Sequence, residues 1–89
     1  MTEDPCKHLT AITHVSLPDD PVCEECIITG GEWLHLRTCQ TCGKTLCCDS
    51  SPAKHASKHF KTTGHPVMAS AEPGERWIWC FVHEQILGY

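Results

Sequence analysis

Cysteine and histidine side chains recur along the chain at spacings that let neighbours bind one metal ion. The pairs within reach of a single ion are Cys6-x-His8, Cys23-x2-Cys26, Cys39-x2-Cys42, His55-x3-His59 and Cys80-x2-His83. His65 and one of the adjacent Cys47 and Cys48 complete a set of twelve ligands, enough for three tetrahedral sites. Mixed thiolate and imidazole ligands favour zinc over magnesium, calcium or manganese. We therefore expect three zinc ions, and two at minimum, while spacing alone leaves open which pairs share an ion.

The pattern of these cysteines favours metal binding over a disulfide scaffold. The chain has 89 residues, of which eight are cysteine and seven are histidine. Its first residues contain neither a basic region nor an apolar stretch typical of a secretory signal, so we expect a cytoplasmic, reducing location where thiols stay free. A chain this short buries a thin apolar core, and closed four-ligand zinc sites would stabilise it.

Composition also narrows the classes of function. The net charge of −4 argues against a partner bound mainly through phosphates, and no apolar run is long enough to span a membrane. The H-x-E element of zinc deaminases is missing, and no βαβ pattern of a thiol oxidoreductase surrounds the spare cysteine. We therefore expect a non-catalytic single domain over residues 1–89, with residues 1–5 flexible.

The expected architecture is a small zinc-stapled α+β domain, in which a short antiparallel sheet packs on one main helix. Strands are predicted at 33–37, 45–48, 67–70 and 76–81. In the first of these strands, successive side chains point to opposite faces of the sheet. This places Leu34 and Leu36 on one face and Trp33, His35 and Arg37 on the other.

One helix is predicted to run from Pro52 to about Lys61. The Ser50-Ser51-Pro52 sequence is a helix-start signal, with Ser51 as the cap and proline at the first helical position. Gly64 followed by Pro66 is a stop signal. Elsewhere we expect irregular structure over 1–22, tight metal-binding turns at 23–26 and 39–43, a turn at 72–75 and one helical turn at 83–87.

The order of these motifs resembles the UBP-type zinc finger, the ubiquitin-tail-binding domain of some deubiquitinases and of a histone deacetylase. The resemblance rests on Cys23-x2-Cys26, Trp33, Arg37, Cys39-x2-Cys42-Gly43, Cys47, His55, His59 and Thr63-Gly64-His65-Pro66. The Cys47-Cys48-Asp49-Ser50-Ser51 segment and the Pro73-Gly74-Glu75-x-Trp77-x-Trp79-Cys80 segment are most similar to stand-alone bacterial members.

This resemblance implies an interleaved set of ligands for three zinc ions. The implied sets are Cys6, His8, Cys80 and His83; Cys23, Cys26, Cys47 and His55; and Cys39, Cys42, His59 and His65. Cys47 is preferred to Cys48 because it lies five residues after Cys42, as in the family. The sets place His55 and His59 on different ions although they share a helix face.

The resemblance also implies a pocket that takes the free Gly-Gly carboxylate of ubiquitin between aromatic side chains and an arginine. Trp79 and Phe81 match family pocket positions, and Trp33 is expected nearby. The position of the family's arginine is Asp49 here, where a carboxylate would repel a carboxylate ligand. Arg37 could substitute, because a guanidinium grips a carboxylate bidentately. The alternative is that Trp33 and Arg37 form a cation–π pair that only covers the sheet.

We therefore expect a zinc-binding, monomeric protein-interaction module that recognises a partner's C-terminal tail, through Trp33, Arg37, Trp79 and Phe81. One alternative is a structural zinc domain that docks on a partner other than ubiquitin through an exposed face. A second alternative, nucleic-acid binding, would depend on three lysines of the main helix, Lys54, Lys58 and Lys61.

Overall fold

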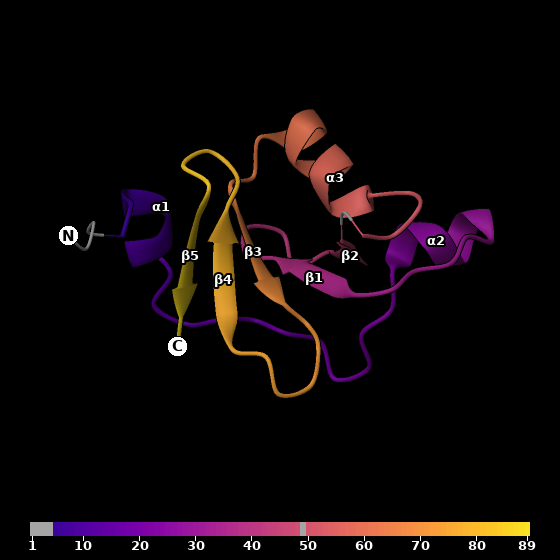
Figure 1. Ribbon diagram of the computed structural model, residues 1–89, viewed down its shortest axis with the longest axis horizontal. Coiled ribbons are helices and arrows are strands. Elements are labelled where there is room, and N and C mark those ends of the chain that lie inside the picture. The colour runs from indigo at the N-terminus through magenta and orange to yellow at the C-terminus, as the bar shows by residue number, and fades with distance from the viewer. Residues whose placement is uncertain (1–4, 49) are drawn as a thin grey trace.

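The computed structural model describes residues 5–48 and 50–89. The expectation that residues 1–5 are flexible concerns mainly residues 1–4, which lie outside the described residues, as does Asp49. In chain order the elements are α1 (Lys7–Thr10), α2 (Glu24–Thr29), β1 (Leu36–Cys39), β2 (Thr45–Cys47), α3 (His55–Thr63), β3 (Val67–Ser70), β4 (Trp77–Cys80) and β5 (Gln85–Gly88) (Figure 1). None of the helices among the described residues has the length and apolar composition of a membrane-spanning helix.

The five strands form one antiparallel sheet in the order β2-β1-β3-β4-β5. Its register aligns Met68, Trp79 and Ile86 in one row across three strands. Since side chains alternate between the two faces of a strand, Arg37 shares the face of this row and Ile78 lies on the opposite face. The predicted α+β class, with a short antiparallel sheet and one main helix, is confirmed.

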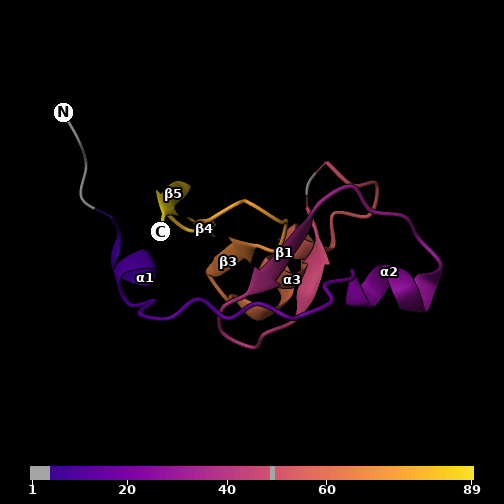
Figure 2. The same cartoon turned by 90° about the horizontal axis from the view of Figure 1, so that it is seen from below.

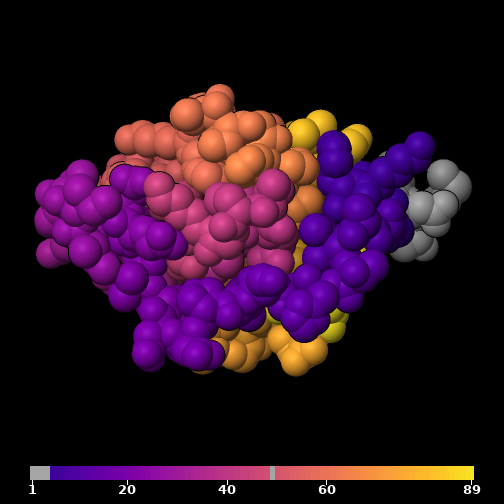
Figure 3. Space-filling view, turned by 180° about the vertical axis from the view of Figure 1, so that it is seen from behind, coloured from indigo at the N-terminus to yellow at the C-terminus, as the bar shows by residue number. Residues whose placement is uncertain are grey.

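The N-terminal segment covers one face of the sheet and is more ordered than its sequence suggests. Residues Lys7–Thr10 form the single turn α1, so the prediction of irregular structure over 1–22 is wrong there. Leu9 from this turn is buried against Val67 and Ile78. Further along, the Gln40 side chain accepts a hydrogen bond from the backbone N–H of Ser16 and donates one to the Ser16 carbonyl. The segment therefore crosses the molecule as a strap that is visible in Figures 2 and 3.

The first predicted metal-binding turn continues into the helix α2. Two carboxylates in its first turn stabilise it by lying near the positive end of the helix dipole. They also join the helix to β2, because Glu24 accepts a hydrogen bond from the Thr45 N–H (2.6 Å) and Glu25 pairs with Lys44. These contacts hold the start of α2, which carries metal-binding residues, against the start of β2.

The main helix α3 begins three residues later than predicted, at His55. The predicted cap, Ser51, has another role, since its buried hydroxyl accepts a hydrogen bond from the Leu34 N–H (2.8 Å). Lys54 occupies the N-cap instead, with a left-handed φ of 50° and no side-chain cap. The predicted stop is confirmed, because Gly64 ends the helix in the left-handed conformation (φ 76°).

Two other predicted elements differ from the structure. The strand predicted at 33–37 is shifted to β1, and Leu34, whose N–H is bound by a serine, is 62% exposed rather than on the inner face. The helical turn predicted at 83–87 is wrong, because the chain reverses after β4 and pairs with it as β5. Glu84 takes a positive φ of 51° at this reversal, which a sequence pattern does not reveal.

Replacing Gly64 by alanine should destabilise the zinc-loaded protein by about 1 kcal/mol, the approximate cost of holding a side chain in the left-handed region. An added Cβ would meet nothing within 4 Å, so the effect would come from the backbone alone. Urea unfolding at fixed zinc concentration measures it. Thr62→Ala, an exposed change in the last turn of α3, is the control and should change stability by less than about 0.5 kcal/mol. An equal loss in both variants would contradict the backbone explanation.

Candidate metal centres and binding pocket

Twelve cysteine and histidine side chains gather in three groups of four, and within each group the donor atoms all lie within 4.8 Å of one another. We name them site A (Cys6, His8, Cys80 and His83), site B (Cys23, Cys26, Cys47 and His55) and site C (Cys39, Cys42, His59 and His65). The structure thus brings together the same sets that the family resemblance implies. Three groups of this kind could each hold a zinc ion.

Site B joins α2, β2 and α3. Its three cysteines are fully buried. The Nδ1 atom of His55 lies 3.3 Å from the Sγ atom of Cys23, 3.4 Å from that of Cys26 and 3.5 Å from that of Cys47. Backbone N–H groups also point at the sulfurs, since Cys26 N–H donates to Cys23 and His55 N–H donates to Cys47 (3.2 Å). Such donors stabilise thiolates.

Site C lies one helical turn further along α3. Cys39 ends β1 and Cys42 follows in the tight turn, which is confirmed by the bond from Gly43 N–H to the Cys39 carbonyl (2.8 Å). The histidine donors approach from the other side. His59 Nε2 lies 3.4 Å from Cys42 Sγ, and His65 Nδ1 lies 3.5 Å from Cys39 Sγ and 3.3 Å from His59 Nε2.

Site A ties the start of the chain to its last strands. Cys6 and His8 come from the N-cap and first turn of α1, Cys80 ends β4 and His83 lies in the turn before β5. The Cys80 Sγ atom is 3.3 Å from His8 Nδ1 and 3.6 Å from His83 Nδ1. A metal ion here would fasten segments more than 70 residues apart in sequence.

The donor separations fit a tetrahedral zinc ion. Zinc–sulfur bonds of about 2.3 Å and zinc–nitrogen bonds of about 2.0 Å place two ligand atoms about 3.3 to 3.8 Å apart on a tetrahedron. The closest donor pairs lie 3.3 Å to 3.6 Å apart between sulfur and nitrogen, and the sulfurs of Cys26 and Cys47 lie 3.9 Å apart. With four protein donors each, such sites are closed and suited to a structural role.

Because these sites are buried, their cysteine thiols keep their protons until a cation binds. Burial, together with the neighbouring thiols of Cys23 and Cys47, raises the pKa of Cys26 to about 12. Burial likewise raises the pKa values of Cys39 and Cys80. These thiols are therefore protonated at neutral pH until a cation displaces their protons.

Zinc binding should consequently release protons and weaken as the pH falls. Sites A, B and C contain two, three and two thiols, so loading the metal-free protein at pH 7 should release about seven protons. Because protons compete with zinc for thiolates, affinity should decrease most steeply with falling pH at site B. Zinc titration in weak buffer counts the protons, and competition with a chromophoric chelator from pH 7.5 to pH 5 gives the affinities. Affinity independent of pH would contradict thiolate ligation.

Cys48 lies next to site B without joining it. Its buried Sγ atom is 3.9 Å from His35 Nδ1 and 3.9 Å from Ser51 Oγ. Burial acts to raise the pKa of Cys48, but hydrogen bonds from the Ser50 backbone, Ser51 and His35 outweigh it and lower the pKa to about 7. The Sγ atom of Cys47, and not that of Cys48, lies among the donor atoms of site B.

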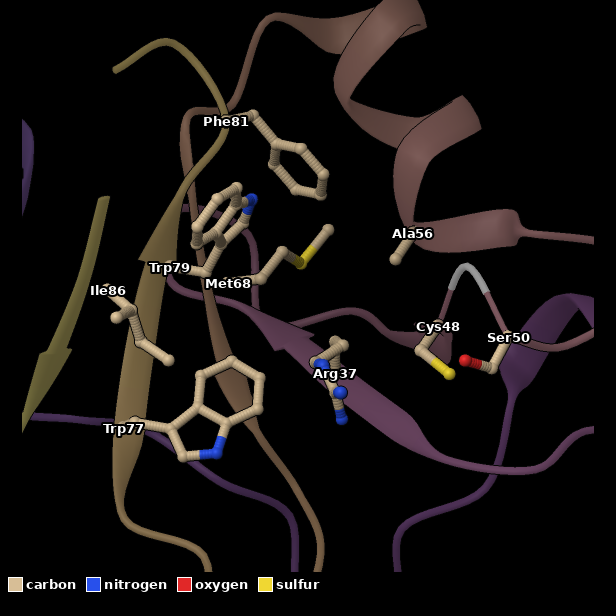
Figure 4. A pocket seen from close by; sticks show the side chains of 9 residues that line it. All are labelled: Arg37, Cys48, Ser50, Ala56, Met68, Trp77, Trp79, Phe81 and Ile86. Carbon is tan, nitrogen blue, oxygen red and sulfur yellow. The ribbon is translucent and has the colours of Figure 1, made fainter. Parts of the chain in front are cut away.

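A pocket of about 230 Å³ opens on the face of the sheet that α3 flanks. It is lined by Arg37, Cys48, Ser50, Ala56, Met68, Trp77, Trp79, Phe81 and Ile86. Figure 4 shows the rings of Trp77, Trp79 and Phe81 along one side of the pocket, with Arg37 beside Trp77. The Phe81 ring stacks on Phe60 of α3, with ring centroids 4.9 Å apart. The sheet and the helix thus both support an aromatic wall.

Arg37 supplies the positive charge of this pocket. Its guanidinium carbon lies 4.5 Å from the ring centroid of Trp77, and one N–H donates to the Leu36 carbonyl (2.9 Å). Among residues 5–48 and 50–89 the guanidinium makes no ion pair, since Lys44 and Glu25 form the ion pair found there. A half-buried guanidinium without a carboxylate partner is suited to bind an anion.

Three of the nine residues that line the pocket are predicted from the sequence, and Trp77 is among the six that are not. Arg37, Trp79 and Phe81 line the pocket, whereas Trp33 packs against the core beside site B. The alternative of a cation–π pair between Trp33 and Arg37 is wrong, because the strand begins after Trp33 and the Arg37 guanidinium lies over the Trp77 ring instead. The alternation of β4 could have revealed Trp77, which is two residues from Trp79 and so on the same face.

Comparison with known proteins agrees with this arrangement. The profile of the family described as "Zn-finger in ubiquitin-hydrolases and other protein" (zf-UBP) matches residues 23–87, well over half of the chain. The chain therefore belongs to the UBP-type zinc-finger family and is a zinc-binding module. No curated protein matches it.

Among solved structures, the chain is similar to protein RPA1320 from Rhodopseudomonas palustris, determined by NMR in solution. The two are 45% identical in sequence, with a TM-score of 0.82 over 98% of this chain and 84% of that one. Their likeness agrees with a small bacterial UBP-type zinc finger.

Proposed function

We propose that this chain is a non-catalytic protein-interaction module in which sites A, B and C each hold one structural zinc ion. The twelve side chains of the three sites would be the ligands, four to each ion. Zinc there supplies no open coordination position for a reaction, because every ligand comes from the protein. Its role would be to fasten the helices and the sheet around the pocket.

We further propose that the pocket captures the free C-terminal tail of a protein partner, with a Gly-Gly end like that of ubiquitin. The observation that carries this proposal is Arg37, a half-buried guanidinium in an aromatic pocket without an ion-pair partner among the described residues. A terminal carboxylate would complete its hydrogen bonding bidentately. A pocket of about 230 Å³ favours a tail whose last residues lack side chains.

Replacing Trp79 by alanine should weaken tail binding by roughly 30- to 1,000-fold with little change in zinc content. The ring forms part of the pocket wall, and removal of a central aromatic contact typically costs about 2 to 4 kcal/mol of binding energy. Calorimetry with ubiquitin and zinc analysis of the same samples measure both quantities. Leu34→Ala, a change at an exposed side chain outside the pocket, is the control. Loss of metal in the Trp79 variant would show a structural residue, and the pocket assignment would then fail.

An NMR titration of the zinc-loaded protein with ubiquitin tests the proposed function. It is performed once with an intact Gly-Gly end and once with that end removed. We expect shifts at Arg37, Trp79 and Phe81 only with the intact tail. No shift with either form would exclude ubiquitin, and shifts with both forms would place its binding outside the pocket. The first result would leave a structural zinc domain that docks on a different partner, and the second would leave one that binds ubiquitin through another surface.

A further inference from the structure

Two contacts hold the Arg37 guanidinium in place before any ligand arrives. Its central carbon lies over the ring of Trp77, 4.5 Å from the ring centroid, and one N–H donates a hydrogen bond to the backbone carbonyl of Leu36 (2.9 Å). The contacts come from different strands, since Trp77 is on β4 and Arg37 on β1, with β3 between them. The sheet register therefore decides where the guanidinium points.

We propose that Trp77 is the positioning residue of this pocket, orienting Arg37 for the terminal carboxylate and so setting the preference for a free C-terminus. This inference rests on the proposed capture of a tail and deepens it. An arginine that moves freely among its rotamers loses that freedom when it binds, whereas a stacked guanidinium has already lost it. The ring holds the guanidinium from one side, and the N–H groups that do not bond Leu36 would be available to a carboxylate.

The position of Trp79 provides an internal comparison. Both rings line the pocket from the same face of β4. The cation–π contact of Arg37, however, is with Trp77 and not with Trp79. The ring of Trp79 instead forms a T-shaped pair with Phe81, with ring centroids 6.5 Å apart. If Trp77 acts through Arg37, its removal weakens the binding of a carboxylate selectively. If it acts only as an apolar wall, its removal weakens every tail equally, as removal of Trp79 should.

The test uses the zinc-loaded protein and a peptide with the last eight residues of ubiquitin, prepared as the free acid and as the C-terminal amide. Calorimetry gives the ratio of the two affinities for wild type, Trp77→Leu, Trp77→Phe and the matched control Trp79→Leu. We expect Trp77→Leu to reduce the acid-to-amide ratio about tenfold. Trp77→Phe, which keeps an aromatic face, should restore most of the ratio, and Trp79→Leu should weaken both peptides and leave the ratio unchanged.

If Trp77→Leu weakens binding of the acid and the amide equally, the positioning role is overturned. It is also overturned if Trp77→Leu still changes the acid-to-amide ratio in a chain that already carries Arg37→Gln. Zinc content and the amide NMR spectrum show whether each variant is folded, and Trp77→Met replaces Trp77→Leu if the leucine variant loses zinc. If wild type binds neither peptide, the proposed function fails. The positioning role is then decided by titrating acetate while following the Arg37 Nε–Hε signal. A shift that is larger in wild type than in Trp77→Leu supports it, and equal shifts or none overturn it.

Discussion

Removal of zinc by a chelator at neutral pH should unfold the chain. A structural zinc ion contributes about 10 to 16 kcal/mol of apparent binding free energy, while the whole free energy of unfolding of a small domain is about 5 to 15 kcal/mol. The core around site B consists largely of its own cysteines with Leu36, Leu46 and Met68, so apolar packing alone is a weak substitute. Near-UV circular dichroism of the three tryptophans and the dispersion of the amide NMR spectrum report the loss.

The control for this experiment is the same chelator already saturated with zinc, which should leave both spectra unchanged. Adding excess zinc to the chelated sample should restore them, because metal binding and folding are coupled. A chelated chain that keeps its near-UV signal and its amide dispersion would show that packing holds the fold. The structural role of the three sites would then be contradicted.

Replacing Arg37 by alanine should weaken binding of a free-acid tail by about 10- to 100-fold. A hydrogen bond to a charged group contributes about 1.5 to 3 kcal/mol, and a bidentate carboxylate contact belongs to the strong end of that range. Arg37→Lys keeps the charge without the planar fork and should give an intermediate loss. Calorimetry of the zinc-loaded variants with intact ubiquitin measures the change.

Arg76 offers a matched control for this prediction. It is also a stacked arginine, with its guanidinium carbon 4.9 Å from the Tyr89 ring and its Nε–H bonded to the Tyr89 carbonyl, but it lies outside the pocket. Arg76→Ala should leave tail binding within about twofold of wild type. Equal losses in the Arg37 and Arg76 variants would mean that general charge, rather than the pocket arginine, attracts the partner.

The pairs of metal-binding side chains could be predicted from the sequence, because the spacing within a pair is a local property. Cys23-x2-Cys26 and Cys39-x2-Cys42 each fit one ion whatever the rest of the chain does, and the family resemblance supplied the interleaving. The choice between Cys47 and Cys48 followed from the same resemblance, and the structure places the Cys47 sulfur among the donors of site B.

The pocket could be predicted only in part, because it is formed by contacts across the sheet. The partner of Arg37 proved to be Trp77, which is 40 residues away, and only the strand order brings them together. The start of α3 was misplaced for a similar reason, since the Ser51 hydroxyl binds the distant Leu34 N–H instead of capping the helix. The effect of Asp49, where the family has an arginine, concerns a residue outside the described part of the chain.

Native mass spectrometry of the protein purified in the presence of zinc tests the central claim most directly. The three groups of four donors predict a folded monomer that carries three zinc ions. Acidification should remove these ions together with the compact charge-state distribution. A folded monomer that carries two ions or fewer at saturating zinc would contradict the account, since at least one of the three groups would then be only a cluster of side chains.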